Sequence, residues 1–201
     1  MLNKNIIQQF DILGARVFVA GFDGNAEVKP VMPAARQRYI DSCNDGQAKR
    51  QRYCVWVLLD YALKQTVGKG VDELSFTVDS NGKWHCDGGI DFSLSHCGKV
   101  VAVAVSARPV GVDVEAVNEP RFNLRLANRI LTEREQALFD KLPQERQPQA
   151  LLEFWTKKES LFKRDGGKTF VPSAIDTTVC DAHCLTVAIE NKQYVIAVAN
   201  I

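Results

Sequence analysis

The hydrophobic and polar positions of the chain follow two different periods, which predicts a protein of mixed strands and helices. Short runs rich in Val, Ile and Phe favour strands at 15–22, 74–78, 83–86, 92–96, 99–106, 109–115, 185–189 and 194–199. The run at 99–106 is almost wholly apolar, which is typical of a strand buried on both faces. Asn81-Gly82 favours a hairpin turn, and a final hairpin is expected around Asn191-Lys192.

Apolar residues at helical spacing predict helices at 47–66, 123–131, 132–142 and 148–164. Thr132 and Glu135 form a capping-box pattern, in which each side chain satisfies a free backbone amide at the start of a helix. Each half of the chain holds one long helix with several strands around it. We therefore expect an α+β protein made of two similar lobes, 1–108 and 109–201.

Composition narrows the class of protein. Hydrophobic residues make up 46% of the 201 residues, enough to form a core. The net charge of +1 gives no field that would attract nucleic acid or an anionic membrane. No apolar run reaches the length of a membrane span, and the first ten residues are too polar for a signal peptide. We therefore expect a cytoplasmic protein without a nucleic-acid or membrane partner.

The six cysteines include no C-x-x-C pair, and in a cytoplasmic protein they are expected to be free thiols. Cys180, His183 and Cys184, even together with His85-Cys86, match no common spacing of zinc ligands. Zinc is therefore not predicted.

The acidic strand at 109–115 is the first candidate for chemistry. Residues two apart in a strand point to the same face, so Asp113 and Glu115 should lie together while Val112 and Val114 face a core. Two adjacent carboxylates repel unless a cation lies between them or one is protonated. Mg²⁺ is often held by one or two carboxylates together with substrate phosphates. At this point two interpretations of the acids remain: a metal site, or a solvated pair of acids at a strand edge.

The predicted helix at 148–164 carries a second group of charges. On a helical projection Glu159 and Lys163 lie together on the shoulder of its apolar stripe, and Lys158 lies within the stripe. An ordinary ion pair and a lysine whose stem follows the apolar surface are the alternative interpretations. With Ser95-His96 at the end of a predicted strand, these residues would suit a metal-bound polyphosphate.

Three motifs give a resemblance to a known family. They are F-S-L-S-H-C-G at 92–98, G-V-D-V-E at 111–115 and W-T-K-K-E-S-L-F-K at 155–163. In order and spacing they resemble the 4′-phosphopantetheinyl transferases of the larger, two-lobed surfactin-synthetase-activating type. Gly82-Lys83 is similar to the family's G-K-P motif, although Trp84 stands in place of the proline. The resemblance extends from about Arg36 to Pro172.

The resemblance implies a fold and a reaction. The fold would be two α/β lobes related by a pseudo-twofold axis, each a small, mostly antiparallel sheet packed on a long helix, with the active site between them. A monomer would transfer the 4′-phosphopantetheine arm of coenzyme A to a serine hydroxyl of an apo acyl, peptidyl or polyketide carrier protein. The products would be the holo carrier and 3′,5′-ADP. The metal would be Mg²⁺, with Mn²⁺ as the alternative.

The resemblance also implies roles for particular residues. The implied metal ligands are Asp113, Glu115 and Glu159. The implied catalytic residues are Glu159, which would take the serine proton, with Lys163 and Asp113. The implied ligands of coenzyme A are Arg50, Lys83, Ser95, His96 and Lys163. Arg52 competes with Arg50 for the 3′-phosphate, and Arg36 and Arg38 are candidates for the family's N-terminal basic residues. A carrier protein would dock on the segment at 117–141.

Two other functions stay open on the sequence alone. One is a module that binds coenzyme A or a carrier protein without reacting. The other is a different Mg²⁺-dependent phosphoryl or nucleotidyl transferase. A carboxylate base beside a metal ion would have a lowered pKa, whereas an activity change near neutral pH would point to His96.

Overall fold

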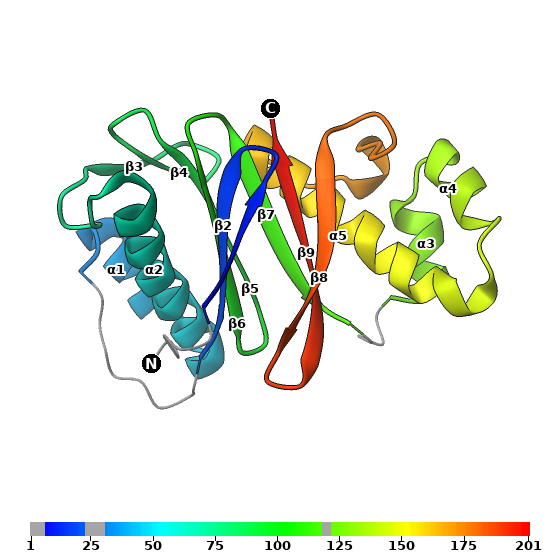
Figure 1. The fold of residues 1–201 in the computed structure, drawn as a ribbon, viewed down its shortest axis with the longest axis horizontal. Helices are drawn as coiled ribbons and strands as arrows, with labels where there is room; N and C mark the ends of the chain where they lie inside the picture. The colour runs from blue at the N-terminus through cyan, green and yellow to red at the C-terminus, as the bar shows by residue number, and fades with distance from the viewer. Residues whose placement is uncertain (1–6, 23–30, 118–121) are drawn as a thin grey trace.

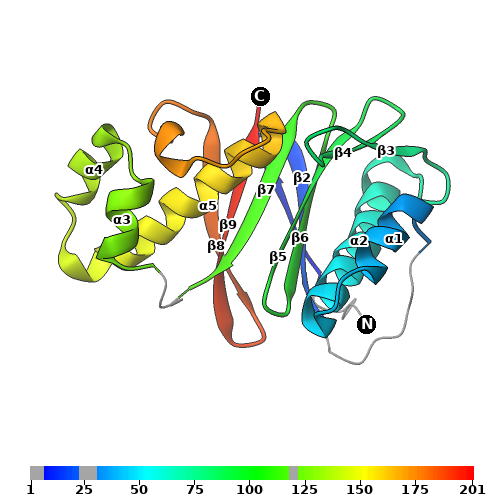
Figure 2. The same cartoon turned by 180° about the vertical axis from the view of Figure 1, so that it is seen from behind.

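The computed structural model describes residues 7–22, 31–117 and 122–201. It confirms the α+β class, with antiparallel sheets in the centre and helices on both sides. In Figure 1, α1 and α2 cover one outer side of the sheets, while α3 and α4 lie at the opposite end of the molecule. Figure 2 shows α5 lying across β7, β9 and β8. No helix in these three described ranges is long and apolar enough to cross a membrane.

The N-terminal part of the chain forms a four-stranded sheet with the order β1-β2-β6-β5. Its strands are β1 (Gln8–Ile12), β2 (Ala15–Gly21), β5 (Asp91–Cys97) and β6 (Val100–Ser106). The helices α1 (Ala34–Asp41) and α2 (Gly46–Val67) and the short hairpin β3 (Phe76–Val78) and β4 (Trp84–Cys86) complete this part. Asp45 caps α2 by accepting hydrogen bonds from two backbone amides, and Gly68 ends it in the left-handed conformation.

The C-terminal part forms a three-stranded sheet with the order β7-β9-β8. Its strands are β7 (Val110–Ala116), β8 (Ala182–Ile189) and β9 (Lys192–Asn200). Its helices are α3 (Leu124–Ile130), α4 (Glu133–Phe139) and α5 (Gln147–Asp165), with short 3-10 turns η2 (Gln144–Arg146) and η3 (Pro172–Ala174). The capping box of Thr132 and Glu135 at the start of α4 is confirmed.

The β6 strand is buried along its whole length, as its apolar run predicts. Val101, Val103 and Val105 belong to the core beneath α2, whereas Ala102 and Ala104 belong to the core between the two sheets. A third core lies where α5 meets α3 and α4. Each part therefore has a sheet and a long helix, but the boundary at 108/109 and the pseudo-twofold relation stay predictions.

Two elements are absent from the sequence-based prediction. The β1 strand is short and lies at the edge of its sheet, where alternate residues face solvent and weaken the apolar signal. The α1 helix is mostly polar and has no side-chain cap at its N-terminus. The final hairpin turns at Glu190 and Asn191, which both have positive φ, one residue earlier than expected.

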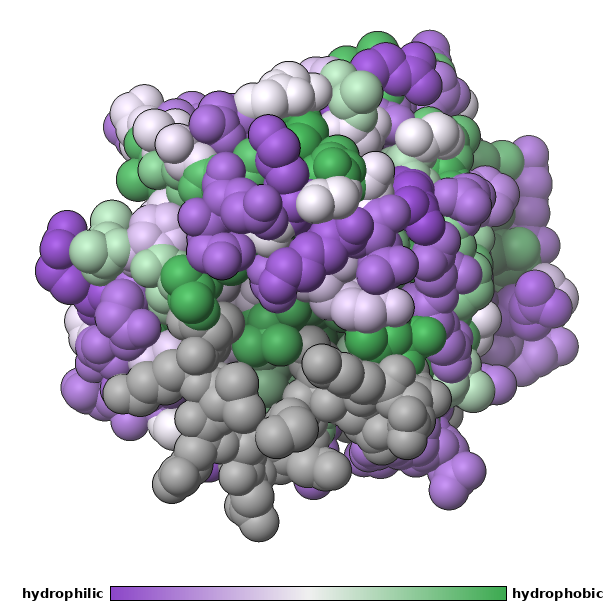
Figure 3. All heavy atoms as spheres, turned by 60° about the vertical axis from the view of Figure 1, so that its left-hand side comes forward, coloured by the Kyte–Doolittle hydropathy of each residue, from purple (hydrophilic) through white to green (hydrophobic). Residues whose placement is uncertain are grey.

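The described residues on the side where α1 and α2 lie form a mostly hydrophilic surface (Figure 3). Figure 3 shows hydrophilic residues over much of that face, with smaller apolar patches between them. Part of the segment at 117–141 that was expected to dock a carrier protein, residues 118–121, lies outside the described residues.

Candidate active site

Gly111 explains why the acidic strand and α5 lie so close together. A Cβ at this position would lie 1.8 Å from the backbone oxygen of Ser160 on α5. Because side chains alternate along β7, Gly111, Asp113 and Glu115 share one face. The two acids therefore face α5, while Val112 and Val114 are buried in the core between the sheets. The predicted orientation of this strand is confirmed.

Asp113 is the centre of a buried polar cluster. Its Oδ1 accepts a hydrogen bond from Ser95 Oγ at 2.8 Å and from Lys163 Nζ at 2.7 Å. Lys163 Nζ also donates to Ser95 Oγ at 3.0 Å and lies 3.7 Å from Glu159 Oε2. The structure thus brings together residues from β5, β7 and α5 that are up to 68 positions apart in the chain.

Lys163 remains an ammonium at neutral pH. Loss of water around the amine would lower its pKa, but the carboxylates of Asp113 and Glu159 outweigh this and raise the pKa above its ordinary value. Its side chain is 28% exposed, so the charge also faces solvent. The expected pairing of Glu159 with Lys163 is present, yet the shorter contact of Lys163 is with Asp113.

Glu115 is held by the tryptophan of the third motif. Trp155 Nε1 donates to Glu115 Oε1 at 3.1 Å. The Trp155 ring itself packs edge-on against Phe122 and Phe170, at centroid distances of 6.2 and 5.4 Å. Trp155, Glu159 and Lys163 follow one another at four-residue intervals, so one side of α5 supplies all three contacts to this site.

The donor set is compatible with a divalent cation. Asp113 Oδ2 is buried and has no hydrogen-bond partner among the described residues, which is costly for a carboxylate oxygen. Within the described part of the chain, however, no three His, Cys, Asp or Glu side chains are already close enough to enclose a metal ion. The three predicted metal ligands therefore do not form a closed cage. Mg²⁺ characteristically keeps several waters and binds substrate phosphates as well as carboxylates, so an incomplete set fits it.

A cavity of about 310 Å³ lies next to this cluster, and we call it the α2–α5 cavity. Residues from α1, α2, the turn between β3 and β4, β5 and the end of α5 form its walls. Its cationic and titratable lining residues are Arg36, Arg52, Lys83, His96 and Lys163. Such a lining favours an anionic ligand.

Arg36 is a buried cation for which the described residues supply no acidic partner. It is only 7% exposed, and its Nε has no hydrogen-bond partner within the described residues. Its guanidinium lies over the rings of Tyr39, Trp56 and Trp84, at 5.3–5.9 Å from their centroids. Burial lowers the pKa of Arg36 to about 10, so it stays charged at neutral pH.

The structure distinguishes between the two arginines that the sequence left open. Arg52 lines the α2–α5 cavity and lies 4.5 Å over the ring of Tyr39. Arg50 is exposed and does not line the cavity. The geometry therefore favours Arg52, and the assignment of Arg50 to the 3′-phosphate stays a prediction.

His96 lines the same cavity and is an exposed residue of β5. Removal of water by the cavity walls, followed by the charges of Lys163 and Arg52, lowers the pKa of His96 to about 4. The imidazole is therefore neutral at pH 7, and titration of His96 near neutral pH is not expected in the free protein.

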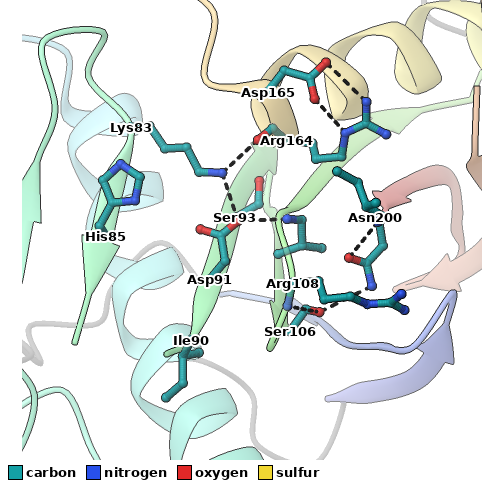
Figure 4. A network of polar contacts seen from close by, with 12 residues as sticks. Lys83, His85, Ile90, Asp91, Ser93, Ser106, Arg108, Arg164, Asp165 and Asn200 are labelled. Carbon is teal, nitrogen blue, oxygen red and sulfur yellow. Dashed lines mark hydrogen bonds and ion pairs between the residues drawn. The ribbon is translucent and has the colours of Figure 1, made fainter. Parts of the chain in front are cut away.

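Ser95 and Lys83 are engaged differently from the expectation that they bind phosphates. Ser95 is buried, and its hydroxyl contacts Asp113, Lys163 and the backbone amide of Val114. Lys83 Nζ donates to Asp91 Oδ2 and to the backbone oxygen of Arg164, both at 2.9 Å (Figure 4). Both residues thus have protein partners in this structure, and their role in binding phosphates stays a prediction.

Sequence reasoning missed the partner of Lys158. The Lys158 side chain is completely buried and forms an ion pair of 2.5 Å with Glu135, which is also completely buried. Lys158 Nζ donates to the backbone oxygens of Pro172 and Ile175 as well. Burial lowers the pKa of Lys158, against the opposing pull of the Glu135 carboxylate. The only signal in the sequence was a lysine within the apolar stripe of a helix.

The site now combines an acidic strand, a Glu–Lys helix and a cationic cavity, and comparison with known proteins gives a consistent result. Residues 109–199 match the 4′-phosphopantetheinyl transferase superfamily. The resemblance drawn from the three motifs is thereby confirmed. The matched segment includes β7 and α5, so it contains Asp113, Glu115, Glu159 and Lys163.

Individual relatives agree with the family match. The chain is 31% identical over 101 residues to "4′-phosphopantetheinyl transferase gsp" of Aneurinibacillus migulanus, covering 50% of this chain and 42% of the relative. It is 34% identical over 108 residues to "4′-phosphopantetheinyl transferase AcpT" of Salmonella typhi, covering 49% and 56%. It is 29% identical over 112 residues to "4′-phosphopantetheinyl transferase psf-1" of Bacillus pumilus, covering 55% and 47%. The chain thus spans about half the length of the curated relatives it matches.

Proposed function

We propose that this protein transfers the 4′-phosphopantetheine arm of coenzyme A to a serine hydroxyl of an apo carrier protein, in a metal-dependent reaction that releases 3′,5′-ADP. The observation that carries the proposal is the position of Asp113. Its Oδ2, which has no hydrogen-bond partner among the described residues, and its bond to Lys163 lie beside a cavity lined by cations. A metal-bound diphosphate that carries a phosphorylated nucleotide needs carboxylates for the metal next to cations for the phosphates.

Asp113, Glu115 and Glu159 would hold a Mg²⁺ or Mn²⁺ ion. Bound there, the ion would neutralise charge on the diphosphate of coenzyme A. Trp155 would fix the direction of the Glu115 carboxylate through their hydrogen bond. Lys163 would stabilise the negative charge that develops on the leaving phosphate, since its pKa keeps it cationic.

The chemical step would be a phosphoryl transfer. The serine oxygen of the carrier would form a bond to the phosphorus that bears pantetheine, and the bond from that phosphorus to the oxygen of the leaving 3′,5′-ADP would break. Glu159, whose side chain is 27% exposed, would accept the serine proton. Arg36 and Arg52 would bind the phosphates of the nucleotide, and neutral His96 would contribute a hydrogen bond in the same cavity.

The decisive experiment is intact-mass analysis of a panel of apo carrier proteins mixed with coenzyme A, with and without Mg²⁺. A metal-dependent mass gain of one phosphopantetheinyl group is expected on at least one carrier. Asp113→Asn keeps the size of the side chain and should slow transfer by about 10²–10³-fold, the usual cost of losing one preorganised electrostatic group. Asp181→Asn changes an exposed acid in the same part of the protein and is the matched control.

Three results would contradict the proposal. Normal transfer by Asp113→Asn would refute the assignment of the site. Binding of coenzyme A without a mass gain on any carrier would favour a binding module. Stabilisation by ATP in preference to coenzyme A would favour a different nucleotide-dependent transferase.

A further inference from the structure

We propose that Lys83 is a positioning residue that fastens the β3–β4 hairpin to the end of α5, and that it does not bind the phosphates of the coenzyme. This inference rests on the proposed function, because it concerns the cavity assigned to coenzyme A. It departs from the role that the G-K motif implies by resemblance. The observation behind it is the pair of 2.9 Å contacts from Lys83 Nζ to Asp91 Oδ2 and to the oxygen of Arg164.

The contact with Arg164 caps α5 from outside the helix. The last backbone oxygens of an α-helix have no partner within the helix, and a cation there also complements the helix dipole. Lys83 comes from a hairpin 81 residues away in the sequence and supplies that donor. Lys163, which holds Asp113, precedes Arg164 by one residue. The cap therefore acts on the end of α5 that carries the candidate catalytic lysine.

Asp91 extends the fastening to the acidic strand. The same Oδ2 that accepts from Lys83 also accepts from the backbone amide of Val110 at 2.8 Å. On the same face of β5, Ser93 accepts from the amide of Val112 at 3.0 Å. These side chains join β5 to β7, two strands that belong to different sheets. Lys83 is thus tied to the start of the strand that presents Asp113.

A second contact makes the hairpin and the helix end fit each other closely. Asn81 Nδ2 donates to the oxygen of Gly166 at 2.8 Å. Gly166 has a φ of +63°, and a Cβ there would lie 3.3 Å from Cδ of Lys83. Only a residue without a side chain takes this conformation at little cost. The lysine stem therefore passes over a glycine on its way to the Arg164 oxygen.

The fastened elements are two walls of the α2–α5 cavity. The hairpin supplies Lys83 and Trp84, and the end of α5 supplies Phe162, Lys163 and Gly166. Loss of the Lys83 contacts would let these walls separate, which would disturb both the cavity and the position of Lys163. The effect on the coenzyme would be indirect.

Lys83 is also poorly placed to act as a phosphate ligand. Asp91 forms an ion pair with it at 2.9 Å and so neutralises its charge. Arg36 and Arg52 line the same cavity, and no carboxylate of the described residues forms an ion pair with either. Those two arginines are the better candidates for the anionic groups.

The variants Lys83→Met and Asp91→Asn distinguish a phosphate-binding role of Lys83 from a positioning role. The two roles predict opposite changes in the affinity of Asp91→Asn for 3′,5′-ADP. If Lys83 binds phosphate, Asp91→Asn frees its charge, and 3′,5′-ADP should bind as tightly as before or more tightly. If Lys83 is a positioning residue, both variants weaken binding by about tenfold, as expected for the coupling of contacting charged groups. The double variant should then lose about as much affinity as either single variant, and not the hundredfold that two independent losses would give.

Isothermal titration calorimetry with 3′,5′-ADP gives these affinities, and Lys168→Met is the control, since it removes an exposed lysine just beyond α5. Unchanged or tighter binding by Asp91→Asn, or independent losses in the double variant, would overturn the proposal. Absence of 3′,5′-ADP binding to the unmodified protein would instead refute the proposed function. The positioning role of Lys83 would then be tested by urea unfolding of the same variants. Additive losses of stability in the double variant would overturn that role, and non-additive losses would support it.

Discussion

The buried pair of Glu135 and Lys158 gives the sharpest prediction about stability. Both side chains are 0% exposed, and every proton of the Lys158 ammonium has an acceptor: Glu135 and the backbone oxygens of Pro172 and Ile175. Glu135 in turn accepts from the amide and hydroxyl of Thr177. The pair therefore joins α4 and α5 to the segment that follows η3.

Lys158→Met should destabilise the protein by about 3–5 kcal/mol, because it leaves a carboxylate buried without its cation. Two backbone oxygens lose a donor at the same time. For a protein of this size, such a change lowers the unfolding temperature by roughly 10 °C. Replacing both members, Glu135→Leu with Lys158→Met, should be less harmful than Lys158→Met alone, since no unpaired charge stays buried.

Urea unfolding followed by tryptophan fluorescence measures these changes, and an unchanged dependence on urea would show that stability alone is altered. Lys157→Met is the matched control on the same helix, because that lysine is only half-buried and should change stability by less than about 1 kcal/mol. A loss below about 1 kcal/mol for Lys158→Met would refute the reasoning. So would a double variant that is less stable than the single one.

Three further predictions concern the site itself. Gly111→Ala should destabilise the protein by about 1–3 kcal/mol or more in thermal unfolding, because the added methyl meets the backbone of α5, whereas Gly46→Ala has open space and should change little. The imidazole of His96 should titrate by NMR with a pKa of about 4 in the free protein and a higher pKa once coenzyme A is bound; a midpoint near 6.5 without ligand would contradict the assigned environment. Because this pKa lies below the unfolded value, the unfolded state takes up the proton first, so the contribution of His96 to stability falls as pH decreases from about 6.5 to about 4. Trp155→Phe keeps the ring contacts but removes the hydrogen bond to Glu115, and should weaken Mn²⁺ binding in the presence of coenzyme A by about 10-fold or more, as followed by electron paramagnetic resonance; unchanged affinity would exclude a role in orienting Glu115.

Local features were predictable where the cause lies within a few residues. The double burial of β6 follows from its continuous apolar run, and the start of α4 follows from the capping box. The shared face of Asp113 and Glu115 follows from the two-residue period of a strand. The motifs that carry the family resemblance are likewise short, and the family match to residues 109–199 includes those at 111–115 and 155–163.

Contacts between distant segments could not be read from the sequence. The choice of Arg52 over Arg50 depends on which way α2 is turned toward the cavity, and that is set by packing against the sheet. Lys83 looked available for a ligand, and only the approach of Asp91 and the end of α5 occupies it. These two partners of Lys83 are 8 and 81 residues away from it in the sequence. The short periods of strands and helices therefore do not predict such contacts.

The sequence by itself determined the strands other than β1, the long helices, and the acids and lysines that are available for chemistry, because hydrophobic periodicity and residue type act locally. Tertiary structure alone decided how those charges are paired. It paired Lys158 with Glu135 and Lys163 with Asp113, and it left one oxygen of Asp113 without a partner in the described part of the chain. The physical reason is that the energy of a buried charge depends on what surrounds it in space, and folding sets those surroundings.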